Sequence, residues 1–346
     1  MNANPVLVEA LRGAAVESAH RGALAIVDAD GRPVLALGEV RRAVFPRSAV
    51  KLLQALPLVA SGAADELALS DEELALACAS HNGEPAHVAT ARAMLAKAGL
   101  DAEALECGTH WPARDEAQRE LAARGEAPTP LHNNCSGKHA GFLCLACARH
   151  GRAGLREHVR GYVEPDHAVM REVTAALRCA TGTDLAHAPR GIDGCSIPTF
   201  AIPLADLALA FARVATGAGL SADHARAAAR LRRAIARAPF MVAGTGRFDT
   251  RVMQVLGERV CCKVGAEGVY CAALPERGWG VAIKIDDGNN ARAAEVVMAA
   301  VIEAALRPAG DAAALLRSLS DLTLRNWRGT VVGNLRASAA LRDALP

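Results

Sequence analysis

Segments with the composition of β-strands lie near both ends of this 346-residue chain, and helical patterns fill the stretch between them. Five short apolar runs have this composition: 23–28, 33–37, 259–264, 269–274 and 280–285. The first two are joined by Asp28-Ala29-Asp30-Gly31-Arg32, whose Asp-Gly chemistry suits a hairpin turn. The last three are joined by short glycine-containing segments, which is the pattern of an antiparallel meander. We therefore predict one antiparallel sheet to which both chain ends contribute.

The middle of the chain is predicted to be helical. Helical patterns dominate from about residue 84 to about residue 237, and a further helix is expected at 291–306. Ser70, with Glu73 three residues later, forms a capping box that predicts a helix running through Ala77. These patterns predict an α+β fold with a single domain over 1–346. In it, helices pack on the sheet and an all-helical subdomain is inserted at approximately 70–240.

The charges of the chain nearly balance, with 39 Lys and Arg against 37 Asp and Glu and a net charge of +2. No long run of one sign occurs, which argues against a nucleic-acid or membrane-surface partner. The first residues lack the pattern of a secretory signal, and the apolar runs are too short to span a membrane. We expect a cytoplasmic protein that acts on a small molecule and keeps its ten cysteines reduced.

The stretch from Phe45 to Gln54 contains a candidate nucleophile, Ser48. Pro46 ends the preceding extended segment, and a serine at a helix N-cap lies beside unpaired backbone N–H groups that favour developing negative charge. Lys51 follows one helical turn later, where an amine can take the hydroxyl proton. The spacing is the S-x-x-K signature of serine penicillin-recognising enzymes. The alternative is a capping serine followed by an exposed lysine.

Two further segments carry polar groups that fit the same chemistry. Ser80-His81-Asn82 lies in a predicted loop, and Lys263-Val264-Gly265 ends a predicted edge strand. Only five of the basic residues are lysines, which marks Lys263 and Lys51 as positions where an amine that can lose its proton is useful. The three segments follow the order S-x-x-K, S-x-N, K-x-G of the serine β-lactamase fold. Val264 departs from the K-T-G form of the third motif.

Cys135 and Cys195 lie in two polar, glycine-rich segments, 132–141 and 191–198. Two thiols from separate loops can meet at one tetrahedral metal, with Lys138, His139 or His132 as the third ligand. Ligand chemistry favours a histidine, because a lysine must be deprotonated to bind. The alternative is two ordinary thiols. The remaining cysteines in apolar surroundings are predicted to be small core residues: Cys78, Cys144, Cys147, Cys179 and Cys271.

Over nearly its whole length the sequence resembles the rhizobial-type, or class 3, L-asparaginase family, also called the asparaginase II family. The blocks that carry the resemblance are 47–51, 79–84, 107–112, 132–141, 191–198 and 244–250. The resemblance implies a serine β-lactamase-like fold and homodimers. It also implies the nucleophile and base Ser48 and Lys51, and a second pair, Ser80 and Lys263.

The resemblance further implies a zinc ion held by Cys135, Lys138 and Cys195, which overrules the preference for a histidine ligand. The metal is expected to position the substrate rather than to be essential, and no organic cofactor is expected.

The function expected from these residues is hydrolysis of L-asparagine to L-aspartate and ammonia through an ester on Ser48. Backbone N–H groups at Ser48 and near Gly265 are expected to hold the oxyanion. Four residues are candidates for binding the α-amino and α-carboxylate groups of the substrate: Arg47, Asn82, His139 and Asp193. The alternatives are a β-lactamase or peptidoglycan peptidase, a zinc-dependent hydrolase, and a non-catalytic small-molecule binding protein.

Overall fold

The structure is a computed structural model that describes residues 3–346. The chain divides into two compact units. The first contains the chain up to Ala49, together with Ala201–Ala218 and Cys262–Pro346. The second contains Val50–Phe200 and Gly219–Cys261. The chain thus crosses from the first unit to the second between Ala49 and Val50.

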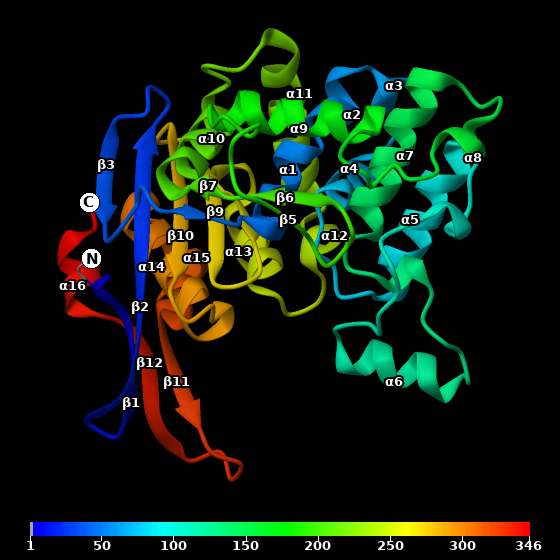
Figure 1. The fold of residues 1–346 in the computed structure, drawn as a ribbon. Coiled ribbons are helices and arrows are strands. Elements are labelled where there is room, and N and C mark those ends of the chain that lie inside the picture. Colours follow the sequence, from blue (N-terminus) through cyan, green and yellow to red (C-terminus); the bar gives the residue numbers. More distant parts are fainter. Residues whose placement is uncertain (1–2) are drawn as a thin grey trace. The chain divides into compact units, whose positions relative to one another are not determined.

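The first unit contains an antiparallel sheet with the strand order β11-β12-β1-β2-β10-β9-β8, to which β3 is added by pairing with β2 (Figure 1). Its strands are β1 (Val6–Arg12), β2 (Ala15–Asp28), β3 (Pro33–Leu37), β8 (Cys261–Val264), β9 (Val269–Leu274), β10 (Trp279–Ile285), β11 (Asp321–Arg325) and β12 (Val331–Ala337). Pairing of β1 with β12 and of β2 with β10 joins the two ends of the chain. This confirms the predicted antiparallel sheet built from both ends.

Strand β2 is long enough to serve two parts of this sheet. Its first half pairs with β1, and the stretch from Gly22 to Asp28 pairs with β10. Helix α10 (Leu204–Thr216) lies directly on β10, because a Cβ at Gly280 would lie 1.9 Å from the carbonyl oxygen of Ala208. Only glycine permits an approach this close. The apolar second half of β2 is consequently buried.

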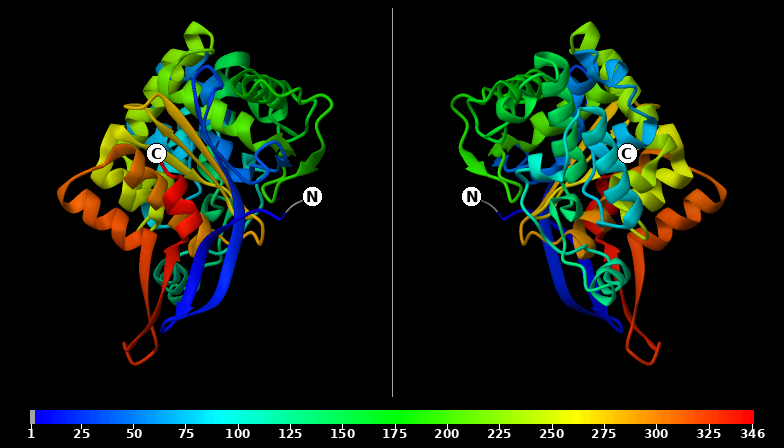
Figure 2. Two further views of the ribbon diagram at one scale, coloured as in Figure 1. Left: turned by 90° about the vertical axis from the view of Figure 1, so that its left-hand side faces the viewer. Right: turned by 90° about the vertical axis from the view of Figure 1, so that its right-hand side faces the viewer.

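The C-terminal part of the first unit contains α14 (Glu295–Leu306), α15 (Gly310–Ser320) and α16 (Ala339–Ala344). A π-helical turn, η5 (Asn290–Ala294), precedes α14, so the helix predicted at 291–306 is irregular in its first turn. Figure 2 shows that the β11–β12 hairpin and the adjoining β1–β2 turn extend at the same end of the sheet. A short pair, β4 (Ala43–Val44) and β7 (Ile202–Pro203), completes this unit.

The second unit is mostly helical. Its α-helices are α1 (Lys51–Gln54), α2 (Leu56–Ala60), α3 (Ala63–Glu66), α4 (Asp71–Ala77), α5 (Pro85–Lys97), α6 (Asp115–Ala123), α7 (Ser136–His150), α8 (Leu155–His158), α9 (Ala168–Thr181), α11 (Ala222–Arg237), α12 (Pro239–Ala243) and α13 (Phe248–Leu256). The capping box of Ser70 and Glu73 at the start of α4 is confirmed. This unit also contains a two-stranded hairpin, β5 (Arg190–Ile192) with β6 (Pro198–Phe200), which the predicted all-helical composition omitted.

Helix α7 packs closely on α4 through glycine. A Cβ at Gly137 would lie 2.4 Å from the backbone oxygen of Leu76, and one at Gly141 would lie 3.2 Å from the Cβ of Ala77. The two glycines of segment 132–141 therefore lie within α7 and serve helix packing. Within residues 3–346, no helix has the length and apolarity required to cross a membrane.

Candidate active site

Ser48 lies in a 3₁₀ turn, η1 (Arg47–Val50), which α1 follows directly. The N-cap of α1 is Val50, so the prediction that Ser48 caps a helix is wrong. The reason is the backbone of Arg47, whose φ of 51° lies in the left-handed region that non-glycine residues rarely adopt. Such strained residues concentrate at functional sites, where the surrounding structure holds them in place.

The end of β8 lies against this turn, within the first unit. A Cβ at Gly265 would lie 2.5 Å from the Pro46 oxygen and 3.2 Å from the Ala49 Cβ, so a larger residue would displace the Ser48 turn. Lys263 is only 2% exposed, and its Nζ donates a hydrogen bond to the Val264 oxygen at 2.8 Å. The Lys263-Val264-Gly265 motif and the Ser48 turn are therefore neighbours.

The N–H of Gly265 itself donates to the Val269 oxygen at 2.8 Å in the turn between β8 and β9. The oxyanion donors expected at Ser48 and near Gly265 stay a prediction. The Gly265 oxygen accepts from Nδ2 of Asn290 at 2.9 Å, and Oδ1 of Asn290 is buried without a hydrogen-bond partner among the described residues. No motif in the sequence indicated a role for Asn290.

Lys51 forms the centre of a polar cluster in the second unit. Its side chain is fully buried, and Nζ lies 2.6 Å from the Ala79 oxygen, 3.0 Å from Ser80 Oγ and 3.0 Å from Cys135 Sγ. The Lys51 and Ser80 motifs therefore meet, as their shared chemistry suggested. A fully buried amine beside a hydroxyl is the arrangement required for proton transfer between them.

Cys135, Lys138 and Cys195 also converge in this cluster. Lys138 Nζ lies 2.9 Å from Cys195 Sγ, and the two thiols are hydrogen-bonded to each other. The bond from Cys195, together with the nearby lysine charges, holds the pKa of Cys135 well below its usual value. Burial acts to lower the pKa of Lys138, but the charges of Cys195 and Cys135 outweigh burial and raise it. These thiols and amines form one electrostatic group.

Local turns deliver the two cysteines to this group. The side chain of Asn133 accepts a hydrogen bond from the Cys135 N–H at 2.8 Å just before α7. Cys195 lies in the turn of the β5–β6 hairpin, where Ser196 has a left-handed φ of 77°. Asp193 begins the same turn, and its charge contributes to the raised pKa of Lys138.

Among the described residues, no three His, Cys, Asp or Glu side chains form a group that could hold a metal ion. The three donors that converge here are two cysteines and a lysine. The histidines considered as third ligand have other partners, because Thr129 contacts His132 and Tyr162 contacts His139.

His139 is fully buried, and its Nδ1 lies 2.6 Å from the hydroxyl of Tyr162. That hydroxyl also accepts from the Glu106 N–H, so its own hydrogen is directed to Nδ1. The proton of the neutral ring then resides on Nε2, which has no partner among the described residues. Burial and the charges of Lys138 and Lys51 hold the pKa of His139 well below its usual value. His139 thus offers an unused N–H donor, and Tyr162 sets its tautomer.

The amide of Asn82 is fully engaged as a donor. Nδ2 donates to the Thr245 oxygen at 3.2 Å and to Glu84 at 3.4 Å, and Oδ1 accepts from Arg247 at 3.1 Å. Asn82 therefore has no unused N–H to offer a substrate. Its oxygen instead orients the Arg247 guanidinium, a group that the sequence analysis did not assign.

Comparison with known proteins assigns the chain to a family. The family model of L-asparaginase II matches residues 8–337. The chain belongs to the L-asparaginase II family. No curated protein matches it.

A solved structure described as "Crystal Structure Analysis of Mglu in its native form" matches with a TM-score of 0.37 and 18% identity. The match covers 84% of this chain and 66% of that chain, so the chain spans slightly less than two thirds of its length.

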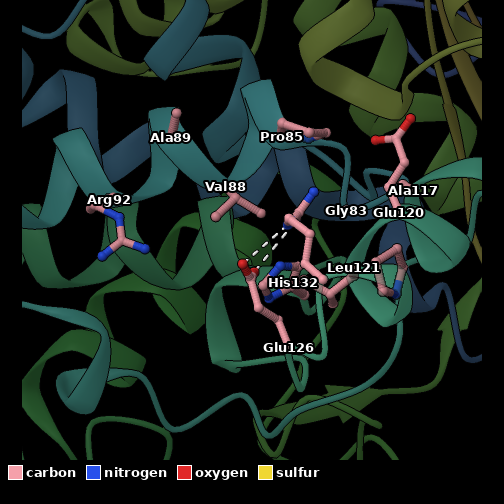
Figure 3. Close-up of a pocket in the computed structure, with 12 residues that line it drawn as sticks. Gly83, Pro85, Val88, Ala89, Arg92, Ala117, Glu120, Leu121, Glu126 and His132 are labelled. Carbon is pink, nitrogen blue, oxygen red and sulfur yellow. Dashed lines mark hydrogen bonds and ion pairs between the residues drawn. The ribbon is translucent and has the colours of Figure 1, made fainter.

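In this L-asparaginase II family member, a pocket of about 300 Å³ lies behind the Ser80 loop, between α5 and α6 (Figure 3). Val88 and Leu121 give it apolar walls, and Glu126 and His132 lie at its polar side. Apart from His132, an alternative considered for the third metal ligand, none of the predicted site residues lines it. The pocket adjoins the Ser80 loop through Gly83 and Pro85, and it does not contain the candidate catalytic residues.

The other cysteines of the asparaginase II chain are mostly core residues, as predicted. Cys78, Cys144, Cys147 and Cys271 are buried. Cys179 is exposed, so its prediction as a core residue is wrong. It lies beside the exposed Arg178 on the outward side of α9, where the apolar residues of the amphipathic helix do not reach.

Proposed function

We propose that this protein hydrolyses L-asparagine to L-aspartate and ammonia, with Ser48 as the nucleophile. The single observation that carries the activity is the match of the L-asparaginase II family to residues 8–337. The nucleophile is supported by the strained turn at Arg47 and by the approach of β8 to that turn. The family match favours none of the alternatives raised by the sequence.

In the proposed reaction, Ser48 Oγ attacks the side-chain amide carbon of asparagine. The C–N bond breaks, ammonia leaves with a proton, and water hydrolyses the resulting ester to release aspartate. Lys51 follows Ser48 by three residues in continuous helical turns, a spacing that places both side chains on one face. The Lys51 amine is the proposed acceptor of the Ser48 proton, and Ser80, at 3.0 Å from that amine, extends the relay.

Lys263 is the second amine in this proposal. Its burial at the end of β8, beside the Ser48 turn, suits a group that delivers a proton to the leaving ammonia and then assists the attack of water. The unused N–H of His139 suits an oxygen of the bound substrate. Arg47 and Asp193 are proposed to bind the charged α-groups, because one adjoins the nucleophile and the other influences the Lys138 cluster.

We further propose that Cys135, Lys138 and Cys195 hold a zinc ion. Two sulfur atoms and one amine converge in a buried cluster. Thiolate sulfur is a ligand that zinc accepts, and the Lys138 amine would have to lose its proton to serve as the third ligand. When bound, zinc supplies a fixed positive charge that positions a polar substrate group. The metal content of purified protein tests this. Cys135→Ala should reduce bound zinc, whereas Cys144→Ala, on the apolar part of α7, should not.

The serine β-lactamase-like fold, the homodimer and the cytoplasmic location stay predictions. Light scattering coupled to size-exclusion chromatography tests the homodimer directly. A mass of twice 35.9 kDa is expected.

Release of ammonia from L-asparagine tests the proposed function. Ser48→Ala should lower kcat by on the order of 10⁴-fold or more, because the covalent route is lost. The matched control is Ser61→Ala, which removes a hydroxyl that bonds Leu58 of α2 and Ala63 of α3 rather than any predicted site residue. A Ser48→Ala variant that retains more than a few per cent of wild-type turnover contradicts the nucleophile, and a wild-type protein without turnover contradicts the function.

A further inference from the structure

Residues 242–244, at the end of α12, pack tightly on the loop that contains Ser80. They have no role in the mechanism above. Ser80 N–H donates to the Val242 oxygen and Asn82 N–H to the Ala243 oxygen, each at 2.9 Å. Gly244 has a φ of 109°, and a Cβ there would lie 2.5 Å from Glu84 Oε1. The backbone from Val242 to Gly244 is therefore fixed against the loop that carries Ser80.

Arg247 follows these residues at the N-terminal end of α13. Its Nη1 donates to Asn82 Oδ1 at 3.1 Å. The orientation of the Asn82 amide is set by its opposite end, where Nδ2 donates to the Thr245 oxygen at 3.2 Å. The side chain of Arg247 is thus held at one nitrogen by Asn82, which follows Ser80 by two residues. Among residues 3–346, its other guanidinium N–H groups remain available.

The charge of Arg247 has no counter-ion among residues 3–346, where no carboxylate lies within 4.0 Å of its guanidinium. Glu84, which shares the Asn82 amide with Arg247, is 6% exposed and already satisfied. It accepts from Arg114 at 2.5 Å and from the N–H and hydroxyl of Thr245 at 2.8 and 2.7 Å. A half-buried guanidinium beside a neutralised carboxylate is a site for an external anion.

We propose that Arg247 binds the α-carboxylate of the substrate amino acid, an inference that rests on the proposed hydrolysis of asparagine. The planar guanidinium donates two parallel hydrogen bonds to a carboxylate, and the bond to Asn82 fixes the plane in which they form. Asn82 is then a positioning residue, and Arg247 is a binding residue for the α-carboxylate in addition to Arg47. The enzyme consequently selects free amino acids over derivatives whose α-carboxylate is neutralised.

The experiment compares L-asparagine with L-asparaginamide, which carries the same side-chain amide but no α-carboxylate. Arg247→Met should raise KM for L-asparagine by about 10- to 100-fold, the loss expected for hydrogen bonds to a charged group. It should change kcat/KM for L-asparaginamide by less than about threefold, because that substrate never used the contact. Product formation is followed by chromatography.

The matched control is Arg251→Met, which removes the same charge from an exposed position one turn further along α13. Arg251→Met should leave KM and kcat/KM unchanged for both substrates. Arg247→Lys keeps the charge and the fold but loses the planar fork, and should raise KM for L-asparagine alone by about 3- to 10-fold. If Arg247→Met does not fold, the KM of Arg247→Lys for L-asparagine tests the role of Arg247 instead.

An unchanged KM for L-asparagine, or equal losses with both substrates, overturns the role of Arg247 while the proposed function stands. A wild-type protein that releases no ammonia from L-asparagine overturns the proposed function and this inference with it. The two failures are therefore distinguishable in one set of assays.

Discussion

Helix α7 has one cysteine at its start and another near its middle, in opposite surroundings. At its N-cap, Cys135 has the Lys51 amine at 3.0 Å and a hydrogen bond from Cys195, and its pKa is lowered. Near the middle, the Cys144 thiol donates to the Met94 oxygen at 3.5 Å, and burial raises its pKa to about 12. The two thiols are equally hidden from water. The hydrogen bond from Cys195 and the nearby lysine charges, rather than burial, therefore make Cys135 the thiol that carries charge more readily.

The same contrast separates chemistry from packing along the helix. The start of α7 brings thiols, amines and the unused N–H of His139 into one polar cluster. The later turns, which contain Cys144 and Cys147, fill the apolar core. The C-x-x-C spacing of this second pair is the more familiar metal motif, yet the chemistry lies with two cysteines sixty residues apart.

The largest expected effect comes from Lys51, the amine that contacts Cys135. Lys51→Met should reduce kcat/KM for L-asparagine by about 10³- to 10⁴-fold, because the proposed base is lost. Lys97→Met is the control. Lys97 also contributes an amine, but that amine pairs with Glu73 at 2.6 Å and is not part of the polar cluster. Its activity should remain near wild type. Equal activity of the two variants would remove Lys51 from the mechanism.

Packing gives the next effect, measured as unfolding free energy in denaturant. Gly137→Ala places a methyl group 2.4 Å from the Leu76 backbone and should destabilise the protein by about 3 kcal/mol. Gly141→Ala places it at 3.2 Å from a side chain, and its better helix propensity should keep the change within about 1 kcal/mol. If Gly137→Ala and Gly141→Ala lowered the free energy of unfolding by similar amounts, α4 and α7 would be no closer at Gly137 than at Gly141.

Thiol reactivity compares the two cysteines directly in protein treated with a chelator. The lowered pKa of Cys135 keeps it a thiolate at pH values below the ordinary 9.0, so its alkylation persists until the pH falls through the lowered value. The raised pKa of Cys144 keeps it protonated until about pH 12. At pH 7 Cys135 should react about 100-fold faster or more, as thiolate fraction governs the rate. Mass spectrometry measures both sites, and the exposed Cys179 serves as the reference for access.

The sequence predicted those features that depend on local patterns. The limits of β3 and β9 are as expected, and the capping box at Ser70 forms. Strands β1, β11 and β12 were missed, because β1 contains charged residues and its partner β12 lies at the other end of the chain. The left-handed backbone at Arg47 was also beyond prediction, since only the packing around it stabilises that conformation.

The candidate site shows the same division. The motifs of Lys51 and Ser80 could be grouped by their chemistry before their contact at 3.0 Å was known. Tyr162 and Arg247 could not, because neither belongs to a recognised spacing and each meets its partner only through the fold. Residues that orient others carry little local signal, whereas nucleophiles and ligands do.

The smallest expected effect concerns Tyr162, which orients the polar end of α7 without belonging to it. Tyr162→Phe removes the hydroxyl that lies 2.6 Å from His139 Nδ1, so the ring can place its proton on either nitrogen. Only the Nε2–H tautomer offers the donor proposed for the substrate, and a mixture of tautomers should raise KM by about 3- to 10-fold with little change in kcat. His139→Gln keeps a donor in a similar place and should partly retain binding, whereas His139→Leu should not. If Tyr162→Phe lowers stability but leaves KM unchanged, the hydroxyl serves packing alone, and the unused N–H of His139 does not contact the substrate.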